Sequence, residues 1–269
     1  MTTPAHVAIV TGANHGIGAA TAERLARDGI AVLVTHLRTR VQDDAQTPER
    51  YQQNRLTEGE EVAARIRARG GRAVAVEADL LESATPSMLF DLAERELGPV
   101  DVLVNNATGW AAGDSFTAGV PDAAGRTTTP VSAELFDRTF GVDARAVALL
   151  IAEFSRRLLA RRGGWGRIVG LTSGGPNGFP GEVTYGAAKI AQENYTLAAA
   201  TELGRHGVTA NMIHPPITDT GWVNDAVREF AATSTEHFHV AEPSEVAAVI
   251  AWLCTDDARM VTGNVIRMR

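Results

Sequence analysis

The chain has 269 residues, of which 45% are hydrophobic and 21% charged, as is usual for a protein that folds around an apolar core. Its formal net charge of -7 argues against general nucleic-acid binding, which leaves a basic footprint on a protein. No apolar run approaches the roughly 20 residues needed to span a bilayer.

Short apolar runs alternate with amphipathic segments along the chain. Runs of Val, Ile and Ala without period-two alternation predict strands buried on both faces. The expected strands are residues 7–10, 31–34, 73–76, 100–104, 167–171 and 208–213. The expected helices are residues 16–28, 57–69, 86–97 and 185–205. This alternation implies right-handed crossovers, so it predicts an α/β fold with a doubly wound parallel sheet, in a single domain over residues 1–269.

Two stretches break the alternation. Residues 38–56 are rich in Arg, Gln and Asp, and residues 109–130 mix Gly, Ala, Thr and Asp with Trp110 and Phe116. Loops of this length are uncommon in a compact domain unless they cover a site or lack order. We therefore expect two insertions, of which the second borders the substrate and the first is a mobile surface segment.

A glycine-rich turn follows the first expected strand. It reads Thr11-Gly12-Ala13-Asn14-His15-Gly16-Ile17-Gly18 and leads into the first expected helix. Glycines let such a turn bring backbone N–H groups close to a pyrophosphate at the positive end of the helix. Glycines also mark tight turns that bind nothing, but the position between a strand and a helix favours nucleotide binding.

Tyr185 and Lys189 are four residues apart, so both side chains lie on one face of a helix. The ordinary pKa of a tyrosine, near 10, is too high for efficient acid–base chemistry at neutral pH. A neighbouring ammonium favours the phenolate and lowers that pKa. The pair therefore indicates a catalytic acid–base group, although a buried tyrosine beside a surface lysine has the same spacing.

Five segments carry a family resemblance along nearly the whole chain. They are the glycine-rich turn, Ala78-Asp79-Leu80, Asn105-Asn106-Ala107, Ser173 ahead of Tyr185-Gly186-Ala187-Ala188-Lys189, and residues 215–220. Together and in this order they resemble the short-chain dehydrogenase/reductase family, and in particular its 3-oxoacyl-acyl carrier protein reductase-like members. The resemblance implies a Rossmann-type fold of about seven parallel strands with helices on both faces.

The resemblance also implies a nicotinamide cofactor. In the family, the residue matching Asp79 contacts the adenine edge, and the Asn-Asn-Ala segment passes beside the adenosine ribose. The implied cofactor-binding residues are Gly12, Asn14, His15, Gly16, Ile17, Gly18, Arg38, Asp79, Leu80, Asn105, Asn106, Ala107, Tyr185, Lys189, Pro215, Thr218 and Thr220.

The end of the second strand favours NADP(H) over NAD(H). An acid there binds the adenosine ribose of NAD, whereas an arginine accommodates the extra phosphate of NADP. The segment offers no acid, and Arg38 has the planar fork that suits a phosphate. His15 lies where NADP-preferring relatives often carry a basic residue. Two alternatives remain: Arg38 and Arg40 only solvate the insertion, or Asp43 or Asp44 returns to the ribose.

By resemblance, Tyr185 transfers the proton, and Lys189 lowers its pKa and holds the nicotinamide ribose. Ser173 hydrogen-bonds the substrate oxygen. Thr172 is a rival for that role because the interval to Tyr185 is one residue short, but the alignment of the preceding strand favours Ser173. Asp143 is the fourth catalytic candidate, where relatives carry an asparagine.

Three residues depart from the family pattern. Thr108 stands where relatives have glycine and narrows the space near the nicotinamide. Asp143 brings a carboxylate that repels a phenolate. Pro216 stiffens the segment after the sixth expected strand and removes an N–H.

The expected function is an NADP(H)-dependent oxidoreductase that reduces a ketone or 3-oxoacyl compound. The alternatives are an alcohol or hydroxysteroid-type dehydrogenase working oxidatively, and a catalytically silent NADP-binding sensor. We expect a small-molecule substrate, a homodimer or homotetramer, and no metal, since His237 and His239 are poorly spaced for a metal on a helix.

The single cysteine and the N-terminus bear on location. Cys254 excludes an internal disulfide and follows an apolar run, so we interpret it as a buried structural thiol. The first residues lack the basic and apolar regions of a signal peptide. We therefore expect a cytoplasmic protein without a membrane partner.

Overall fold

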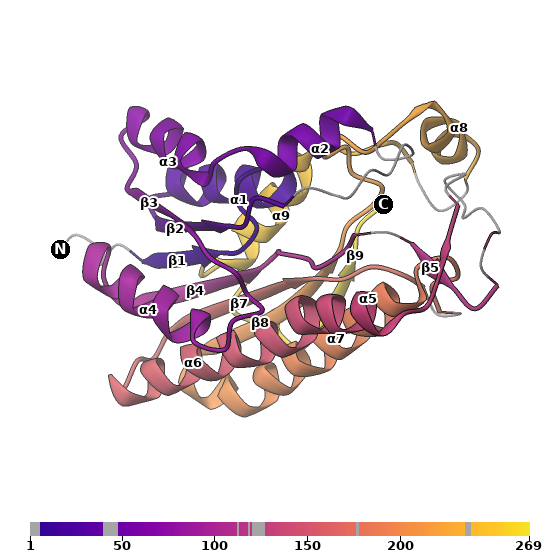
Figure 1. Ribbon diagram of the computed structural model, residues 1–269. Helices are drawn as coiled ribbons and strands as arrows, with labels where there is room; N and C mark the ends of the chain where they lie inside the picture. Colours follow the sequence, from indigo (N-terminus) through magenta and orange to yellow (C-terminus); the bar gives the residue numbers. More distant parts are fainter. Residues whose placement is uncertain are drawn as a thin grey trace.

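The computed structural model describes residues 6–39, 48–111, 113–117, 119, 127–175, 178–234 and 238–269. Seven described strands form one parallel sheet (Figure 1), in the order β3-β2-β1-β4-β7-β8-β9. These strands are β1 (Val7–Val10), β2 (Ala31–His36), β3 (Ala73–Glu77), β4 (Val100–Asn105), β7 (Gly166–Leu171), β8 (Val208–His214) and β9 (Val265–Arg267). A separate pair consists of β5 (Asp114–Ser115) and β6 (Thr129–Pro130).

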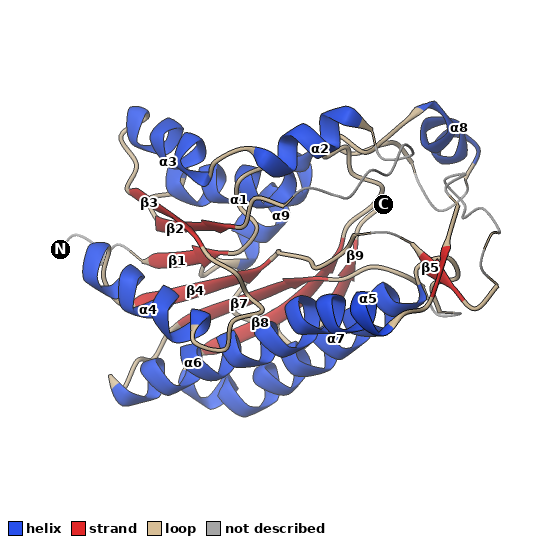
Figure 2. Ribbon diagram, viewed as in Figure 1, coloured by secondary structure: helices blue, strands red, loops and turns tan. Residues whose placement is uncertain are grey.

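Helices cover both faces of the main sheet (Figure 2). They are α1 (Gly16–Arg27), α2 (Glu49–Leu56), α3 (Gly59–Ala68), α4 (Thr85–Glu96), α5 (Ala133–Phe140), the π-helix η1 (Gly141–Ala146), α6 (Val147–Ala160), α7 (Val183–Leu203), the 3-10 helix η2 (Gly204–His206), α8 (Asp225–Thr233) and α9 (Pro243–Leu253). α1, α3 and α9 lie on one face, and α4, α6 and α7 on the other. None of the described helices combines the length and apolarity that a bilayer crossing requires.

The core forms because the central strands are mostly apolar. Every residue of β1, β2 and β7 is buried, as expected for a sheet that is covered on both faces. On one face Leu25, Ile66 and Ile250 pack into the core, and on the other Phe154 and Leu158 do so. The predicted doubly wound parallel sheet of about seven strands is confirmed.

The strand order places a cleft next to β1. The chain runs outward from β1 through β2 to β3, then crosses back to β4 on the other side of β1. In sheets of this kind, ligands bind at the carboxyl ends of the strands where the order reverses. Here β1 ends at the glycine-rich turn and β4 ends at Asn105, so the segments singled out by sequence meet at this point.

The first insertion differs from its expectation as a surface segment. Its residues 49–56 form α2, and the structure leaves residues 40–47 outside the described range. The Asn54 amide donates to the Thr220 carbonyl at 2.9 Å, and the Asn14 amide donates to the Thr57 carbonyl at 2.9 Å. α2 is therefore attached by polar side chains to the loops at the carboxyl ends of the strands, which an apolar pattern does not reveal.

Candidate active site

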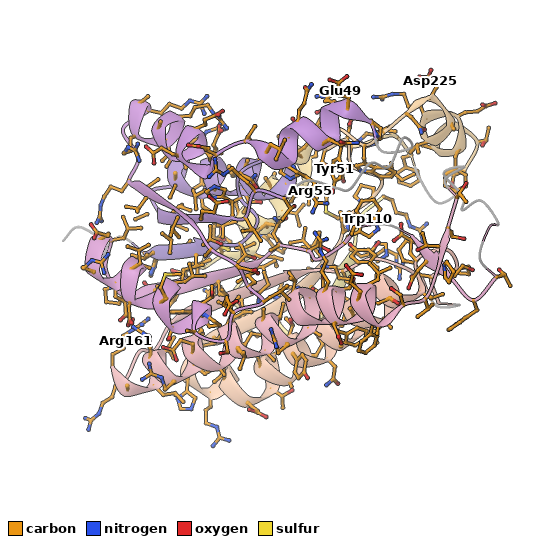
Figure 3. The ribbon with its side chains drawn as sticks, viewed as in Figure 1. Glu49, Tyr51, Arg55, Trp110, Arg161 and Asp225 are labelled. Atoms are coloured by element: carbon orange, nitrogen blue, oxygen red, sulfur yellow. The ribbon has the colours of Figure 1, made fainter. Side chains whose placement is uncertain are left out.

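A cavity of about 920 Å³ lies at the carboxyl ends of the strands. Its walls come from the glycine-rich turn, the segments after β2, β3, β4, β7 and β8, the first turns of α7, and the C-terminal residues. Gly109 and Trp110 line it, so the start of the second insertion borders the cavity. Tyr51 and Arg55 reach it from α2, beside Trp110 (Figure 3). The volume is of the size that ligand sites have.

The glycine-rich turn has the shape that a dinucleotide requires. Gly12 has a φ of +62°, and a Cβ on it would lie 2.8 Å from the Ala107 Cα. A Cβ on Gly18 would lie 2.3 Å from the Gly12 carbonyl oxygen. The Asn106 amide donates to the Thr11 and Gly12 carbonyls, at 2.9 Å each. The turn is thus held tightly against β4, with the positive end of α1 facing the cavity, which fits a pyrophosphate.

Most of the predicted cofactor-binding residues line this cavity. They are Gly12, Asn14, His15, Gly16, Ile17, Asp79, Leu80, Asn106, Ala107, Tyr185, Lys189, Pro215, Thr218 and Thr220. Gly18 and Asn105 do not line it: Gly18 packs beneath the turn, and the Asn105 carbonyl accepts from Gln192 at 3.2 Å. Both residues support the wall from behind.

Arg38 also stays off the cavity wall. Its guanidinium pairs with Glu77 at 2.7 Å and with Glu58 at 2.8 Å. The hydrogen bond from Arg38 is the largest cause that lowers the pKa of Glu77 to about 2. The charge of Arg38 is therefore matched by two carboxylates, contrary to the expectation that it is available for a phosphate.

Ser173 and Tyr185 meet at the cavity. Both line it, and Tyr185 lies in the first turn of α7. Burial is the largest influence on the tyrosine pKa and raises it, whereas Ser173 acts on Tyr185 in the lowering direction. The rival Thr172 is buried and donates its hydroxyl to Glu193 instead. The geometry therefore favours Ser173 over Thr172 as the partner of Tyr185.

The pKa of Tyr185 is raised, whereas the sequence led us to expect a lowered value. Burial raises its pKa well above the ordinary value, and the charges of Asp143 and Glu182 raise it further. The Lys189 ammonium lies 5.5 Å from the centre of the Tyr185 ring, but 2.8 Å from Asp143 Oδ1. Asp143 pairs with Lys189 and acts on the tyrosine pKa in the direction opposite to that of an ammonium.

Comparison with known proteins places these features in one family. A family model described as Enoyl-(Acyl carrier protein) reductase matches residues 12–268. The chain is 30% identical to the uncharacterized oxidoreductase YjdA of Bacillus subtilis, over 97% of this chain and 94% of YjdA. It is also 30% identical to a 3-oxoacyl-[acyl-carrier-protein] reductase of Synechocystis sp., again over 97% and 94%.

A solved structure of a related enzyme supports the same family assignment. The angucycline C-6 ketoreductase LanV with bound NADP matches with a TM-score of 0.74 at 31% identity, over 97% of this chain and 93% of LanV. The chain belongs to the short-chain dehydrogenase/reductase family. It is thus an oxidoreductase that uses a nicotinamide cofactor and acts on a small molecule.

Two of the residues that depart from the expected family pattern, Thr108 and Asp143, are in direct contact. Asp143 is fully buried within the π-helix η1, and π-helical turns often occur at functional sites. The Thr108 hydroxyl donates to Asp143 Oδ2 at 3.1 Å, and the Gly109 N–H donates to the same oxygen at 2.7 Å. Thr108 therefore supplies a side-chain hydrogen bond that a glycine at this position could not make. Asp143 does not line the cavity but lies behind Lys189.

Two residues that line the cavity had no assigned role in the sequence. The Trp110 indole donates to Glu182 at 2.6 Å, and Glu182 is 6% exposed. Arg55, on α2, is 7% exposed. The position of Glu182 three residues before Tyr185 is a signal that points to the site, whereas nothing in the sequence around Arg55 does so.

Proposed function

We propose that this protein reduces a ketone or 3-oxoacyl compound with NADPH, using Tyr185 as the proton donor. The observation that supports it is the convergence of Ser173, Tyr185 and Lys189 on the cavity that the glycine-rich turn also lines. When bound, the cofactor supplies the hydride.

Each of the three side chains has a separate task. The Tyr185 hydroxyl gives its proton to the carbonyl oxygen as that oxygen gains negative charge. The Ser173 hydroxyl donates a hydrogen bond to the same oxygen and fixes its position, a contribution often worth a few kcal/mol. Lys189 holds the ribose hydroxyls of the nicotinamide. Asp143 lies behind them as the ion-pair partner of the lysine.

The charge state of Tyr185 supports the reductive direction over the oxidative one. Its ordinary pKa, near 10, already keeps the phenol protonated at neutral pH, and burial, Asp143 and Glu182 all raise the pKa and make the phenolate rarer still. Reduction needs a protonated tyrosine, whereas oxidation of an alcohol needs the phenolate as a base. The expected enzyme is therefore a reductase, and the oxidative dehydrogenase is the less favoured direction of the same site.

We propose NADP(H) as the cofactor in preference to NAD(H). The segment Val34-Thr35-His36-Leu37-Arg38-Thr39 contains no acid that would bind a free ribose hydroxyl. Arg55 lines the cavity beside Thr39 and offers a positive charge, and His15 lines it as a neutral hydrogen-bonding group. LanV, which was solved with NADP, is similar over nearly its whole length.

The aromatic part of the cavity lining suits an apolar substrate. It consists of the side chains of Trp110, Phe179, Trp222 and Phe230. Aromatic walls with a few polar groups are typical of sites that bind apolar organic molecules. This composition favours a ketone with a sizeable apolar body over a small polar one.

The test is NADPH and NADH oxidation at neutral pH against small, acyl-type and bulky ketones. Tyr185→Phe removes only the hydroxyl and is expected to lower kcat by about 10²- to 10⁴-fold. Tyr195→Phe, on the exposed side of the same helix, is the matched control and should retain activity. Full turnover in Tyr185→Phe would contradict the proposal.

The buried Asp143–Lys189 ion pair favours one second candidate, an NADP-binding sensor with little turnover. A sensor would bind NADPH tightly, shown by quenching of protein fluorescence, and would leave it unoxidised with every ketone in the panel. Oxidation of NADPH with any ketone of the panel would favour the reductase over the sensor.

We also propose a homodimer or homotetramer through α6 and α7. Leu149 and Ile190 expose apolar surface on these helices, and light scattering of the purified protein measures the assembly. The free thiol of Cys254, whose pKa is raised to about 12 by burial, suits the reducing cytoplasm that we propose as its location.

A further inference from the structure

Arg55 places a buried charge against neutral groups. Its Nε and Nη2 donate to the Thr39 hydroxyl at 3.2 and 2.8 Å, and its Nη1 donates to the Trp110 carbonyl at 3.0 Å. Among the described residues, no carboxylate lies within ion-pairing distance of this guanidinium. A charge that is 93% removed from solvent in this way is costly unless something compensates it, and Arg55 is 7% exposed. A guanidinium has five N–H donors, so donors remain for a ligand.

Other basic groups lie around Arg55 in the same cavity. His15 and Arg138 line the wall with it. Burial lowers the pKa of each, and the charge of Arg55 lowers both further. Asp79 and Glu134 act in the opposite sense on Arg138 only. At neutral pH His15 is uncharged, because its pKa is lowered to about 4, so the positive charge on this wall comes from Arg55 and Arg138. Two arginines on one wall favour the binding of an anion.

The location of Arg55 indicates which anion. Thr39, which holds the guanidinium, comes three residues after β2 ends at His36. In this fold the end of the second strand faces the adenosine ribose, where NADP carries its extra phosphate. Arg38 is already paired with Glu58 and Glu77. We propose that Arg55, held by Thr39, binds the ribose 2′-phosphate of NADP(H), and this assignment rests on the proposed cofactor.

α2 holds Arg55 in place for this role. Asn54, the preceding residue, donates to the Thr220 carbonyl at 2.9 Å, and the Asn14 amide donates to the Thr57 carbonyl at 2.9 Å. The helix is thereby attached to the glycine-rich turn on one side and to the segment after β8 on the other. A side chain that is ordered before the ligand arrives loses less entropy on binding. The first insertion thus contributes a specificity residue.

The test measures binding of 2′,5′-ADP and 5′-AMP by calorimetry, because the two differ by the 2′-phosphate. Arg55→Gln is expected to weaken 2′,5′-ADP by about 10- to 100-fold, the loss of a charge-assisted phosphate contact. Binding of 5′-AMP should stay within about twofold, which also shows that the site remains folded. Arg55→Lys keeps the charge and should restore part of the affinity.

The matched control is Arg50→Gln, an exposed arginine on the same helix, which should leave both affinities unchanged. Thr39→Val removes the hydroxyl that orients Arg55 and should weaken 2′,5′-ADP several-fold, which keeps the test open if Arg55→Gln does not fold. An equal loss for both nucleotides in Arg55→Gln would place the arginine on a phosphate common to them and overturn the assignment. No loss would overturn it as well.

The affinities of the wild type for the two nucleotides distinguish a failure of this inference from a failure of the proposed function. If the wild type binds 2′,5′-ADP no more tightly than 5′-AMP, the NADP preference itself fails. If the preference is present but survives Arg55→Gln, only the role of Arg55 fails.

Discussion

The Lys189 ammonium lies 2.8 Å from Asp143 Oδ1, with the two side chains 2% and 0% exposed. Lys189 also donates to Gln192 at 3.0 Å. In a buried pair, each charge is tolerated only because the other is present. Lys189 is therefore paired from behind, and the pKa of Tyr185 is raised first by burial and then by the charges of Asp143 and Glu182.

Asp143→Asn is expected to reverse this balance. It removes a charge that raises the pKa of Tyr185 and leaves Lys189 free to favour the phenolate. Reductive kcat/KM falls at high pH, where the tyrosine loses its proton. With a lower tyrosine pKa, this fall begins at a lower pH than in the wild type. It also raises alcohol oxidation at pH 7 by about three- to tenfold, since each unit of fall multiplies the phenolate fraction by ten. The pH profiles of both directions measure this.

Asp137→Asn is the matched control for that profile, since Asp137 is an exposed acid on the neighbouring α5. Its profile should coincide with the wild type. An Asp143→Asn profile that also coincides with the wild type would show that Asp143 does not influence Tyr185.

Thr108→Val tests the hydrogen bond between the two departures from the family pattern. Valine keeps the shape of threonine but removes the hydroxyl that donates to Asp143 Oδ2. The loss of a donor to a buried carboxylate should lower the free energy of unfolding by about 1–3 kcal/mol. Urea denaturation measures it, and Thr108→Ser, which keeps the hydroxyl, should lose much less. In an Asp143→Asn background the effect of Thr108→Val should shrink, because the two residues interact directly.

The fold was predictable because its strands are continuous apolar runs. The expected strands all lie in the sheet, and the C-terminal segment that resembles a last strand is β9. The glycine-rich turn and Tyr185 were likewise visible, since each carries its chemistry within a few residues. Local pattern is enough for features of this kind.

The relationships across the site were not predictable in the same way. Thr108 and Asp143 were noted separately as departures, but they are 35 positions apart and no spacing rule joins them. Arg55 lies in α2, whose sequence Glu-Arg-Tyr-Gln-Gln-Asn-Arg-Leu has almost no apolar face. Its burial depends on hydrogen bonds to distant loops. Those contacts are tertiary, and hydrophobic periodicity does not report them.

Gly12→Ala tests the close approach of the glycine-rich turn to β4. The added Cβ would lie 2.8 Å from the Ala107 Cα, and the φ of +62° is strained for any side chain. The turn must shift, so NADPH binding should weaken by more than about tenfold, or roughly 1.4 kcal/mol. Gly29→Ala has a similar strain at φ +89° but nothing within 4 Å of the Cβ. It should lose about 1 kcal/mol of stability and bind NADPH as the wild type does. Equal NADPH affinities for the two variants would count against a role of the glycine-rich turn in binding the cofactor.

His15 predicts how stability depends on pH. Burial, and then the charge of Arg55, lower its pKa from 6.5 to about 4. Between these values the unfolded chain binds a proton that the folded protein does not, so stability falls as the pH drops from about 6.5 towards 4. The full shift corresponds to at most about 3 kcal/mol.

His15→Gln removes this titration. The free energy of unfolding of this variant, measured in urea at pH 7.5 and 4.5, should therefore change less between the two pH values than that of the wild type. His36, whose pKa is also lowered by burial, remains in both proteins and contributes equally, so the difference between the two slopes isolates His15. Identical slopes would mean that His15 is protonated as easily in the folded protein as in the unfolded chain.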